Sequence, residues 1–227
     1  MILVLRGHIR DSFQDLELLN LVKSIYDINP TNIKIFIHTW SIYSNNISWK
    51  GVEVNNEIVT KEKILDYFGE IKHVIEDILI DDDSTIERIG NLEGNVANGP
   101  MPIIGWKNYW YGKYRIFNHI YNKFRDRSEM VVNFRFDVLD NSNNFDIQFI
   151  CNFVMQNIGR QFNKNCFFRD EKEYFGCDNI YIGNIFTMYN LAYMFFYHMD
   201  DILPQYSDIM NQEFIVFKVN NRLFENS

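Results

Sequence analysis

The sequence predicts an α/β protein: a single domain over residues 1–227, with a mixed, mostly parallel sheet flanked by helices. Three observations support this prediction. Short apolar, β-branched runs alternate along the chain with segments of helical periodicity. Hydrophobic residues make up 47% of the 227 residues, enough to bury a large core. The chain also contains no internal repeat and no low-complexity segment, and single α/β domains of this length are common.

The first forty residues predict a βαβ unit. Residues 1–6 (MILVLR) form a short apolar run, which predicts a strand. Leu18, Val22 and Ile25 then recur at helical spacing, and residues 32–40 (NIKIFIHTW) form a second β-rich run. Because two strands joined by a helix lie parallel in a βαβ unit, we expect a parallel pair here.

The middle of the chain continues the alternation. We expect an irregular polar stretch over residues 41–57, a short helix over 60–68 and a strand over 72–81. Residues 90–105 hold four glycines and two prolines and predict a long loop. Loops of this length inside a compact domain are often lids or binding loops, so closure over a ligand is one hypothesis for it.

The second half begins with an amphipathic helix, expected over 106–127, which carries Lys113 inside its apolar stripe. The clearest buried strand in the chain, residues 129–136 (EMVVNFRF), comes next. Residues 145–158 have helical spacing, although their β-branched content leaves a strand open.

The last third is less regular in its pattern. One or two strands are expected around Gly176, followed by a buried helix over 185–199. Pro204 interrupts the chain, and we expect a final helix and a β-like end at residues 213–219 (EFIVFKV).

Composition excludes several function classes. The net charge of −8, without a Lys/Arg cluster, predicts that the chain binds no nucleic acid. Cys151, Cys166 and Cys177 lack the spacing of zinc ligands and are expected to be reduced, buried thiols. The apolar starting run is too short for a signal peptide, and residues 186–197 are too few to span a bilayer. These features predict a soluble, cytoplasmic protein.

Two acidic clusters are candidates for chemistry. Asp81, Asp82 and Asp83 are adjacent and followed by a serine, which is typical of a solvated turn or a helix start, with a hard-cation site as the alternative. Asp137 instead follows a fully apolar strand, where ligands of open α/β sheets bind. Arg135 shares a strand face with Asp137, which suggests a metal-diphosphate site; the alternative is an internal ion pair between the two.

Residues 129–140 (EMVVNFRFDVLD) resemble the strand and R-x-D segment of small GT-A type glycosyltransferases, where this segment serves as a variant of the DxD motif. LVLRGHIRDSF, IKIFIHTW, WKNYWYGKYRIFNHI and EYFGCDNIYIGN are similar to further segments of those proteins, in the same order. The likeness is to WavE-like lipopolysaccharide glycosyltransferases and to capsid-glycosylating domains of large DNA viruses. In this chain Arg135 replaces the usual first aspartate of DxD.

The resemblance implies a GT-A-like fold and a set of donor-binding residues. Arg6, Gly7 and Arg10 match the turn after the first strand, where the nucleotide would lie. A simple tight turn is the alternative for these three residues. Thr39, with the residues on either side of it, matches the end of the second strand and a wall for the nucleoside.

The resemblance also implies the groups around the diphosphate. Lys113 and Arg135 would bind it; a lysine that merely snorkels to the surface is the alternative for Lys113. Asp137 would take the divalent metal, Mn or Mg, and Asp140 would assist it. Asp178 is the candidate base that removes the proton from the acceptor hydroxyl.

The resulting hypothesis is an enzyme, a nucleotide-sugar-dependent glycosyltransferase that moves a sugar from a nucleotide-diphosphate donor, such as a UDP-sugar, to a hydroxyl of a glycan or glycoconjugate acceptor. A methyltransferase or Rossmann dehydrogenase fits less well, because the first turn (LRGHIRDS) lacks G-x-G-x-x-G. A catalytically inactive, carbohydrate-binding or scaffold domain of a glycan assembly system is the alternative from another class.

Overall fold

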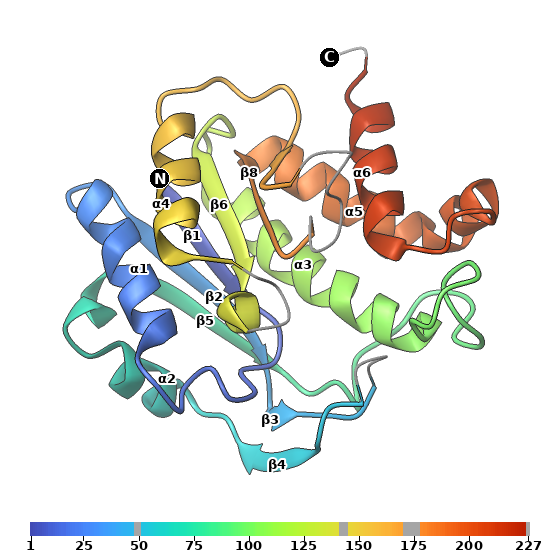
Figure 1. Ribbon diagram of the computed structural model, residues 1–227, viewed down its shortest axis with the longest axis horizontal. Helices are drawn as coiled ribbons and strands as arrows, with labels where there is room; N and C mark the ends of the chain where they lie inside the picture. Colours follow the sequence, from blue (N-terminus) through green and yellow to red (C-terminus); the bar gives the residue numbers. More distant parts are fainter. Residues whose placement is uncertain (48–50, 141–144, 170–177, 226–227) are drawn as a thin grey trace.

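The computed structural model describes residues 1–47, 51–140, 145–169 and 178–225. Its centre is a six-stranded sheet with the strand order β5-β2-β1-β6-β8-β7 (Figure 1). The strands are β1 Ile2–Arg6, β2 Lys34–Trp40, β5 Ile75–Asp81, β6 Met130–Arg135, β7 Cys166–Phe167 and β8 Ile180–Asn184. The first four in spatial order are parallel, and β8 runs antiparallel to both neighbours. The predicted mixed, mostly parallel sheet is therefore confirmed.

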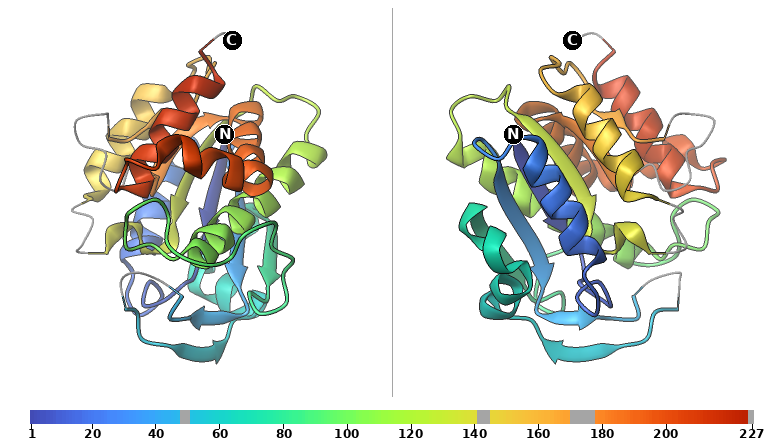
Figure 2. Two further views of the ribbon diagram at one scale, coloured as in Figure 1. Left: turned by 90° about the vertical axis from the view of Figure 1, so that its right-hand side faces the viewer. Right: turned by 60° about the vertical axis from the view of Figure 1, so that its left-hand side comes forward.

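Helices cover both faces of the sheet, as Figure 2 shows. One face carries α1 Glu17–Ile28, α2 Lys61–Phe68 and α4 Ile147–Asn157, and the other carries α3 Ile103–Lys123, α5 Ile185–Ile202 and α6 Gln212–Leu223. In β1, Leu3 and Leu5 enter the core of the first face, while Ile2 and Val4 enter the core of the second. A strand buried on both sides reads as a continuous apolar run, which explains the first residues of the sequence.

Side-chain caps explain where two of the predicted helices begin. The hydroxyl of Thr60 accepts a hydrogen bond from the Lys63 amide at 3.3 Å at the start of α2. Asp146 caps α4 by accepting from the Gln148 amide at 2.7 Å, so the segment over 145–158 is a helix and not a strand. An aspartate at this position satisfies amides that have no partner inside the helix.

The largest differences from the sequence prediction lie in two segments. The polar stretch over 41–57 contains an antiparallel hairpin, β3 Ile42–Ser44 with β4 Asn55–Ile58. The predicted β-like end over 213–219 lies inside α6, so that prediction was wrong. Ile215, Val216 and Val219 all enter the core beside α5, and this helical packing outweighs the β propensity of the segment.

Three short 3₁₀ helices complete the described structure: η1 Gly69–Val74, η2 Phe136–Leu139 and η3 Leu203–Tyr206. η1 delays the start of β5 to Ile75, later than the sequence predicted. β6 ends at Arg135 and η2 begins at Phe136, so Asp137 lies just beyond the sheet and, contrary to the sequence prediction, does not share a strand face with Arg135. Among the described helices, none has the length and apolar character needed to cross a membrane.

The loop after residue 90 is tied to the end of α5. The Asn91 amide donates to the Asp200 carboxylate at 2.7 Å, and Lys107 pairs with the same carboxylate at 2.7 Å. The Asn98 side chain donates to the Ser207 carbonyl at 2.9 Å, next to η3. These contacts hold the loop against α5 and do not support the lid hypothesis.

The strand order creates one topological switch point. From β1 the chain proceeds through β2 to β5 at one edge, and it then returns to place β6 on the other side of β1. In open α/β sheets the loops diverge at such a point and leave a crevice beyond the carboxyl ends of the two strands. The fold therefore predicts a ligand crevice beyond the carboxyl ends of β1 and β6.

Candidate functional site

Three basic side chains are aligned across the carboxyl ends of β2, β1 and β6. The strand register pairs Arg6 with His38 on one side and with Arg135 on the other. The residues that precede them on the same strand face, such as Val4 and Val131, pack in the core beside α3. The two arginines are therefore neighbours at the switch point, on the face that α3 covers.

Arg6 is a buried structural link in this site. It is 2% exposed, and its Nε donates to Asn133 Oδ1 at 2.9 Å. Its Nη2 donates to the Tyr109 hydroxyl at 2.8 Å and to the Asp178 carbonyl at 2.7 Å. One guanidinium thus joins β1, β6, α3 and the segment that precedes β8. Arg6 therefore has a structural role, because it fixes these four elements to one another.

The turn after β1 is fixed to the end of β2. Gly7 has φ +98°, a left-handed conformation that favours glycine, and its amide donates to the His38 carbonyl at 3.1 Å. The Thr39 hydroxyl donates to the Gly7 carbonyl at 2.9 Å and is fully buried. Thr39 therefore holds the turn that carries the predicted nucleotide-binding residues; its direct contact with a nucleoside stays a prediction.

Arg10 reaches the site from that turn through an uncommon backbone conformation. Its φ is +52°, which costs a residue with a side chain more than it costs glycine. Its amide donates to the Tyr43 carbonyl at 2.9 Å in β3, and its Nη1 donates to Asp137 Oδ2 at 2.5 Å. Burial lowers the pKa of Arg10, and Asp137 opposes the shift, so the guanidinium stays charged.

Asp137 also forms a forked ion pair with Arg135. Nε of Arg135 donates to Oδ1 at 2.7 Å, and Nη2 donates to Oδ2 at 2.6 Å. Nη1 of Arg135 donates to Asn179 Oδ1 at 3.3 Å. Burial alone would lower the pKa of Arg135, but the adjacent Asp137 carboxylate holds it above its ordinary value. The internal ion pair that the sequence left as an alternative is present.

The predicted metal ligands do not form a ligand set. Both oxygens of Asp137 accept from guanidinium groups, and Asp140 is exposed at the end of η2. Within residues 1–47, 51–140, 145–169 and 178–225, no group of three or more His, Cys, Asp or Glu side chains is arranged to hold a metal ion. Magnesium and manganese sites need carboxylate oxygens that are open to the ion, so the residues as they stand do not fit this cofactor.

Asp178, the predicted base, lies beside this group. It is 3% exposed, and its carbonyl accepts from Arg6 and, at 2.9 Å, from the Tyr109 hydroxyl. The next residue, Asn179, accepts from the Arg135 side chain at 3.3 Å and from the Arg135 amide at 3.2 Å, so Asp178 lies near Arg135 in the chain trace. Residues 173–177, which carry much of the resembling segment EYFGC, lie outside the described residues.

Lys113 lies on α3, in the interior, among aromatic rings. It is fully buried, and Nζ is 4.0 Å from the centroid of a Trp110 ring, 4.2 Å from Tyr109 and 4.8 Å from Tyr181. An ammonium attracted to ring faces in this way gains cation–π energy that partly offsets its desolvation. This position differs from the snorkelling alternative, and contact with a diphosphate stays a prediction.

A stack of rings forms the wall beside the arginines. Trp40 is 3% exposed and stacks between His8, at 5.8 Å, and Tyr111, at 5.9 Å between ring centroids. His38 is fully buried, and a side chain on Gly112 would come within 2.8 Å of its ring, which explains a glycine inside α3. The predicted wall residues are therefore packed in the interior or at its rim.

The sequence did not single out His8, which faces both acidic clusters. Burial, assisted by the charges of Arg10 and Arg135, lowers the pKa of His8 to about 3. Its Nε2 lies 3.9 Å from Asp83 Oδ2, and within the described chain this nitrogen has no hydrogen-bond partner. The Gly7-His8 sequence directly after a strand was the available signal, but spacing alone does not show where a ring points.

The Asp81–Asp83 cluster is a solvated turn only at Asp82. The Asp82 carboxylate is exposed and accepts from the amide and the hydroxyl of Ser84, at 2.9 and 2.7 Å. Asp81 instead contacts His38 Nε2 at 3.3 Å and Arg115 Nε at 3.2 Å. Asp83 is 8% exposed, and burial raises the pKa of its carboxyl group.

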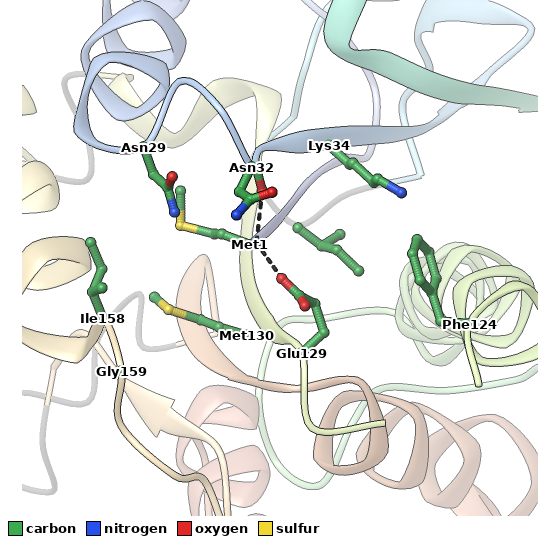
Figure 3. Close-up of a pocket in the computed structure, with 10 residues that line it drawn as sticks. Met1, Asn29, Asn32, Lys34, Phe124, Glu129, Met130, Ile158 and Gly159 are labelled. Carbon is green, nitrogen blue, oxygen red and sulfur yellow. Dashed lines mark hydrogen bonds and ion pairs between the residues drawn. The ribbon is translucent and has the colours of Figure 1, made fainter. Parts of the chain in front are cut away.

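A cavity of about 430 Å³ lies at the opposite, amino-terminal edge of the sheet (Figure 3). In Figure 3 the amino group of Met1 points to Glu129 and to the Asn32 carbonyl, with which it pairs. Phe124 and Ile158 line other parts of its wall. The cavity shares none of the predicted site residues, so it is separate from the candidate site.

Comparisons with known proteins give distant matches only. No family model matches the chain, and no curated protein matches it. Two solved structures of LgtC are similar: one of an active-site mutant, at 13% identity and a TM-score of 0.40, and one of the galactosyltransferase with donor and acceptor sugar analogs, at 12% and 0.39. Each match covers 99% of this chain and 70% of LgtC. The resemblance to WavE-like and capsid-glycosylating proteins remains an expectation.

Proposed function

We propose that the chain is a glycosyltransferase that moves a sugar from a nucleotide-diphosphate donor, such as a UDP-sugar, to a hydroxyl of a glycan or glycoconjugate. The observation that carries the proposal is the convergence of Arg10, Arg135, Asp137 and Asp178 at the switch point between β1 and β6. This is the place where open α/β sheets bind nucleotides. The ordered likeness of five sequence segments to GT-A enzymes supports the same reaction class.

The site offers charged donors to a leaving nucleotide. When a sugar departs from its diphosphate, negative charge develops on the phosphate oxygens. Arg10 and Arg135 are held in place before any ligand arrives, by Asp137 and by the strained turn. Donors fixed in advance need no reorganisation at the moment of reaction, which is the source of electrostatic catalysis.

Asp178 would accept the proton of the attacking hydroxyl. Two hydrogen bonds to its carbonyl, from Arg6 and Tyr109, fix the backbone at this residue. A base must approach the acceptor hydroxyl to within hydrogen-bond distance, so a fixed backbone favours this role. In the same proposal, Arg6, Gly7 and Thr39 shape the nucleotide-binding turn, and Lys113 supplies a positive charge from behind it.

The direct test is a screen of sugar nucleotides for slow hydrolysis, with glycan acceptors added in a second series. We expect one donor class to be hydrolysed by the wild type and at least about 100-fold more slowly by Asp178→Asn, since general-base groups contribute factors of this order. Asp66→Asn, an exposed aspartate on α2, is the matched control and should retain full activity.

Two results separate this proposal from the alternatives. Glycan binding without binding or hydrolysis of any sugar nucleotide would identify an inactive carbohydrate-binding domain instead. Hydrolysis that is equally fast in Asp178→Asn and in the wild type would remove Asp178 from the mechanism and leave the reaction class standing.

A further inference from the structure

We propose that Arg10 and Arg135, seated on Asp137, form a diphosphate-binding fork, and that Asp137 positions the two guanidinium groups instead of binding a metal ion. The inference rests on the proposed function, because it takes the diphosphate from the proposed donor. It differs from the expectation that the R-x-D segment acts as a metal-binding motif.

The Asp137 carboxylate is already occupied by guanidinium groups. Oδ2 accepts from Arg10 at 2.5 Å and from Arg135 at 2.6 Å, and Oδ1 accepts from Arg135 at 2.7 Å. The carboxylate is 8% exposed, so these contacts are made largely without water. A divalent cation at the same oxygens would have to displace a guanidinium and would then face two nearby positive charges, which repel it.

Arg10 has donor capacity beyond its contact with Asp137. A guanidinium has five N–H groups in a planar fork, which matches the oxygens of a phosphate. In the described chain, the Arg10 side chain makes one hydrogen bond, from Nη1 to Asp137. Its side chain is 17% exposed, so Nε and Nη2 remain for an oxyanion that enters the crevice.

The backbone of Arg10 is held in an uncommon conformation. A φ of +52° is uncommon for any residue other than glycine, asparagine or aspartate, and it costs about 1 kcal/mol or more. The Tyr43 carbonyl and the Asp137 carboxylate together hold Arg10 in this conformation. Such strain collects at functional sites, and here its effect is to aim a cation at the switch point.

Local charge shapes what the fork contributes. The negative charge of Asp140 offsets part of the positive charge of Arg10, and that of Asp178 offsets part of the charge of Arg135. The crevice is therefore not strongly positive overall. The fork therefore contributes directed N–H donors more than bulk positive potential. Directed, charge-assisted hydrogen bonds are about twice as strong as neutral ones and specify planar or tetrahedral oxyanions.

The test is a calorimetric titration with inorganic pyrophosphate and with UDP, each in EDTA and in excess Mn²⁺. We expect wild-type affinities in the two buffers to agree within about threefold. Arg10→Gln should weaken both ligands at least about tenfold, in line with the loss of charge-assisted hydrogen bonds, and Arg10→Lys should lie between. Arg125→Gln, which removes the same charge from an exposed loop before β6, is the control and should bind like the wild type.

Wild-type binding in Mn²⁺ but not in EDTA would overturn the inference without requiring any variant to fold. Equal affinities of Arg10→Gln and Arg125→Gln would overturn it as well. The proposed function fails separately: pyrophosphate binding through Arg10 with no sugar-nucleotide hydrolysis counts against the glycosyltransferase and supports the fork. Strictly Mn²⁺-dependent turnover counts against the fork and supports the glycosyltransferase.

Discussion

Two acidic clusters follow parallel strands of the same sheet, and their surroundings differ. Asp137 follows β6 and is held between two guanidinium groups. Asp81 is the last residue of β5 and shares its carboxylate between His38, which burial keeps neutral, and Arg115, which is 42% exposed. The side chains that contact each carboxylate therefore indicate its role better than the number of carboxylates in the cluster does.

Position in the sheet accounts for much of this difference. β6 lies beside β1 at the switch point, whereas β5 is an edge strand with β2 as its one neighbour in the described sheet. A central strand end is enclosed by loops from both directions of the chain, which excludes water and makes ionic contacts stronger. An edge strand end has fewer neighbours, and there Asp82 is exposed, although Asp83 is as buried as Asp137, at 8%.

The largest expected effect of a substitution is at Asp137. Asp137→Ala leaves Arg10 and Arg135 without a counter-charge in a mostly buried place. Removing one member of such a group costs about 3 kcal/mol after allowance for the partial exposure of the arginines, or roughly 10 °C in Tm for a chain of this size. Differential scanning calorimetry at low ionic strength measures the change.

Asp140→Ala is the matched control for this substitution. Asp140 is exposed three residues further along, so its removal should leave Tm within about 1 °C. If both variants melt alike, the ion-pair group at Asp137 adds nothing to stability, and the contrast between the two acidic clusters is lost.

Much of the fold could be predicted from local pattern. The runs at β1, β2 and β6 are apolar on both faces, and α1, α3 and α5 carry strong helical periodicity. The hairpin over 42–58 was missed because its short strands are polar and exposed at β4. The segment over 213–219 was misassigned because its β-branched residues face a neighbouring helix, which no local propensity reveals.

The candidate site was predictable in part for a similar reason. Asp137 and Arg135 are two positions apart, so their proximity is a local feature of the chain, although Asp137 lies in η2 and not in the strand. The contact between Arg10 and Asp137 spans 127 residues and depends on the turn after β1. The buried hydrogen bonds of Arg6 depend on strand register, which the sequence does not supply.

The next effect concerns His8, which lies between the two clusters. Its pKa is lowered to about 3, mainly by burial, while in the unfolded chain it stays near the ordinary value of 6.5. Between these values the unfolded chain binds a proton that the folded chain does not. The stability that neutral His8 provides is therefore complete above pH 6.5 and decreases as the pH falls towards 3.

Between pH 6.5 and pH 5, the unfolding free energy of the wild type should fall by about 2 kcal/mol more than that of His8→Gln. Urea unfolding at both pH values measures this difference, because the variant has no group to protonate at this position. His73→Gln, at an exposed histidine of η1, should keep the wild-type pH dependence. Parallel curves for His8→Gln and the wild type would show that His8 is protonated as easily in the folded chain as in the unfolded one.

The smallest effects separate the members of the second cluster. Asp81→Ala removes contacts to His38 and Arg115 and should cost about 1 kcal/mol, as expected for a partly exposed hydrogen-bonded pair. Asp82→Ala removes contacts to Ser84 alone, in a turn that water also solvates, and should leave Tm unchanged within error. Thermal unfolding of both variants in low and high salt tests this difference, because added salt should reduce the Asp81 effect by screening its charge.

Equal Tm values for the two variants would mean that the whole cluster is a solvated turn. A loss at Asp81 alone would mean that adjacent carboxylates of one run belong to different environments.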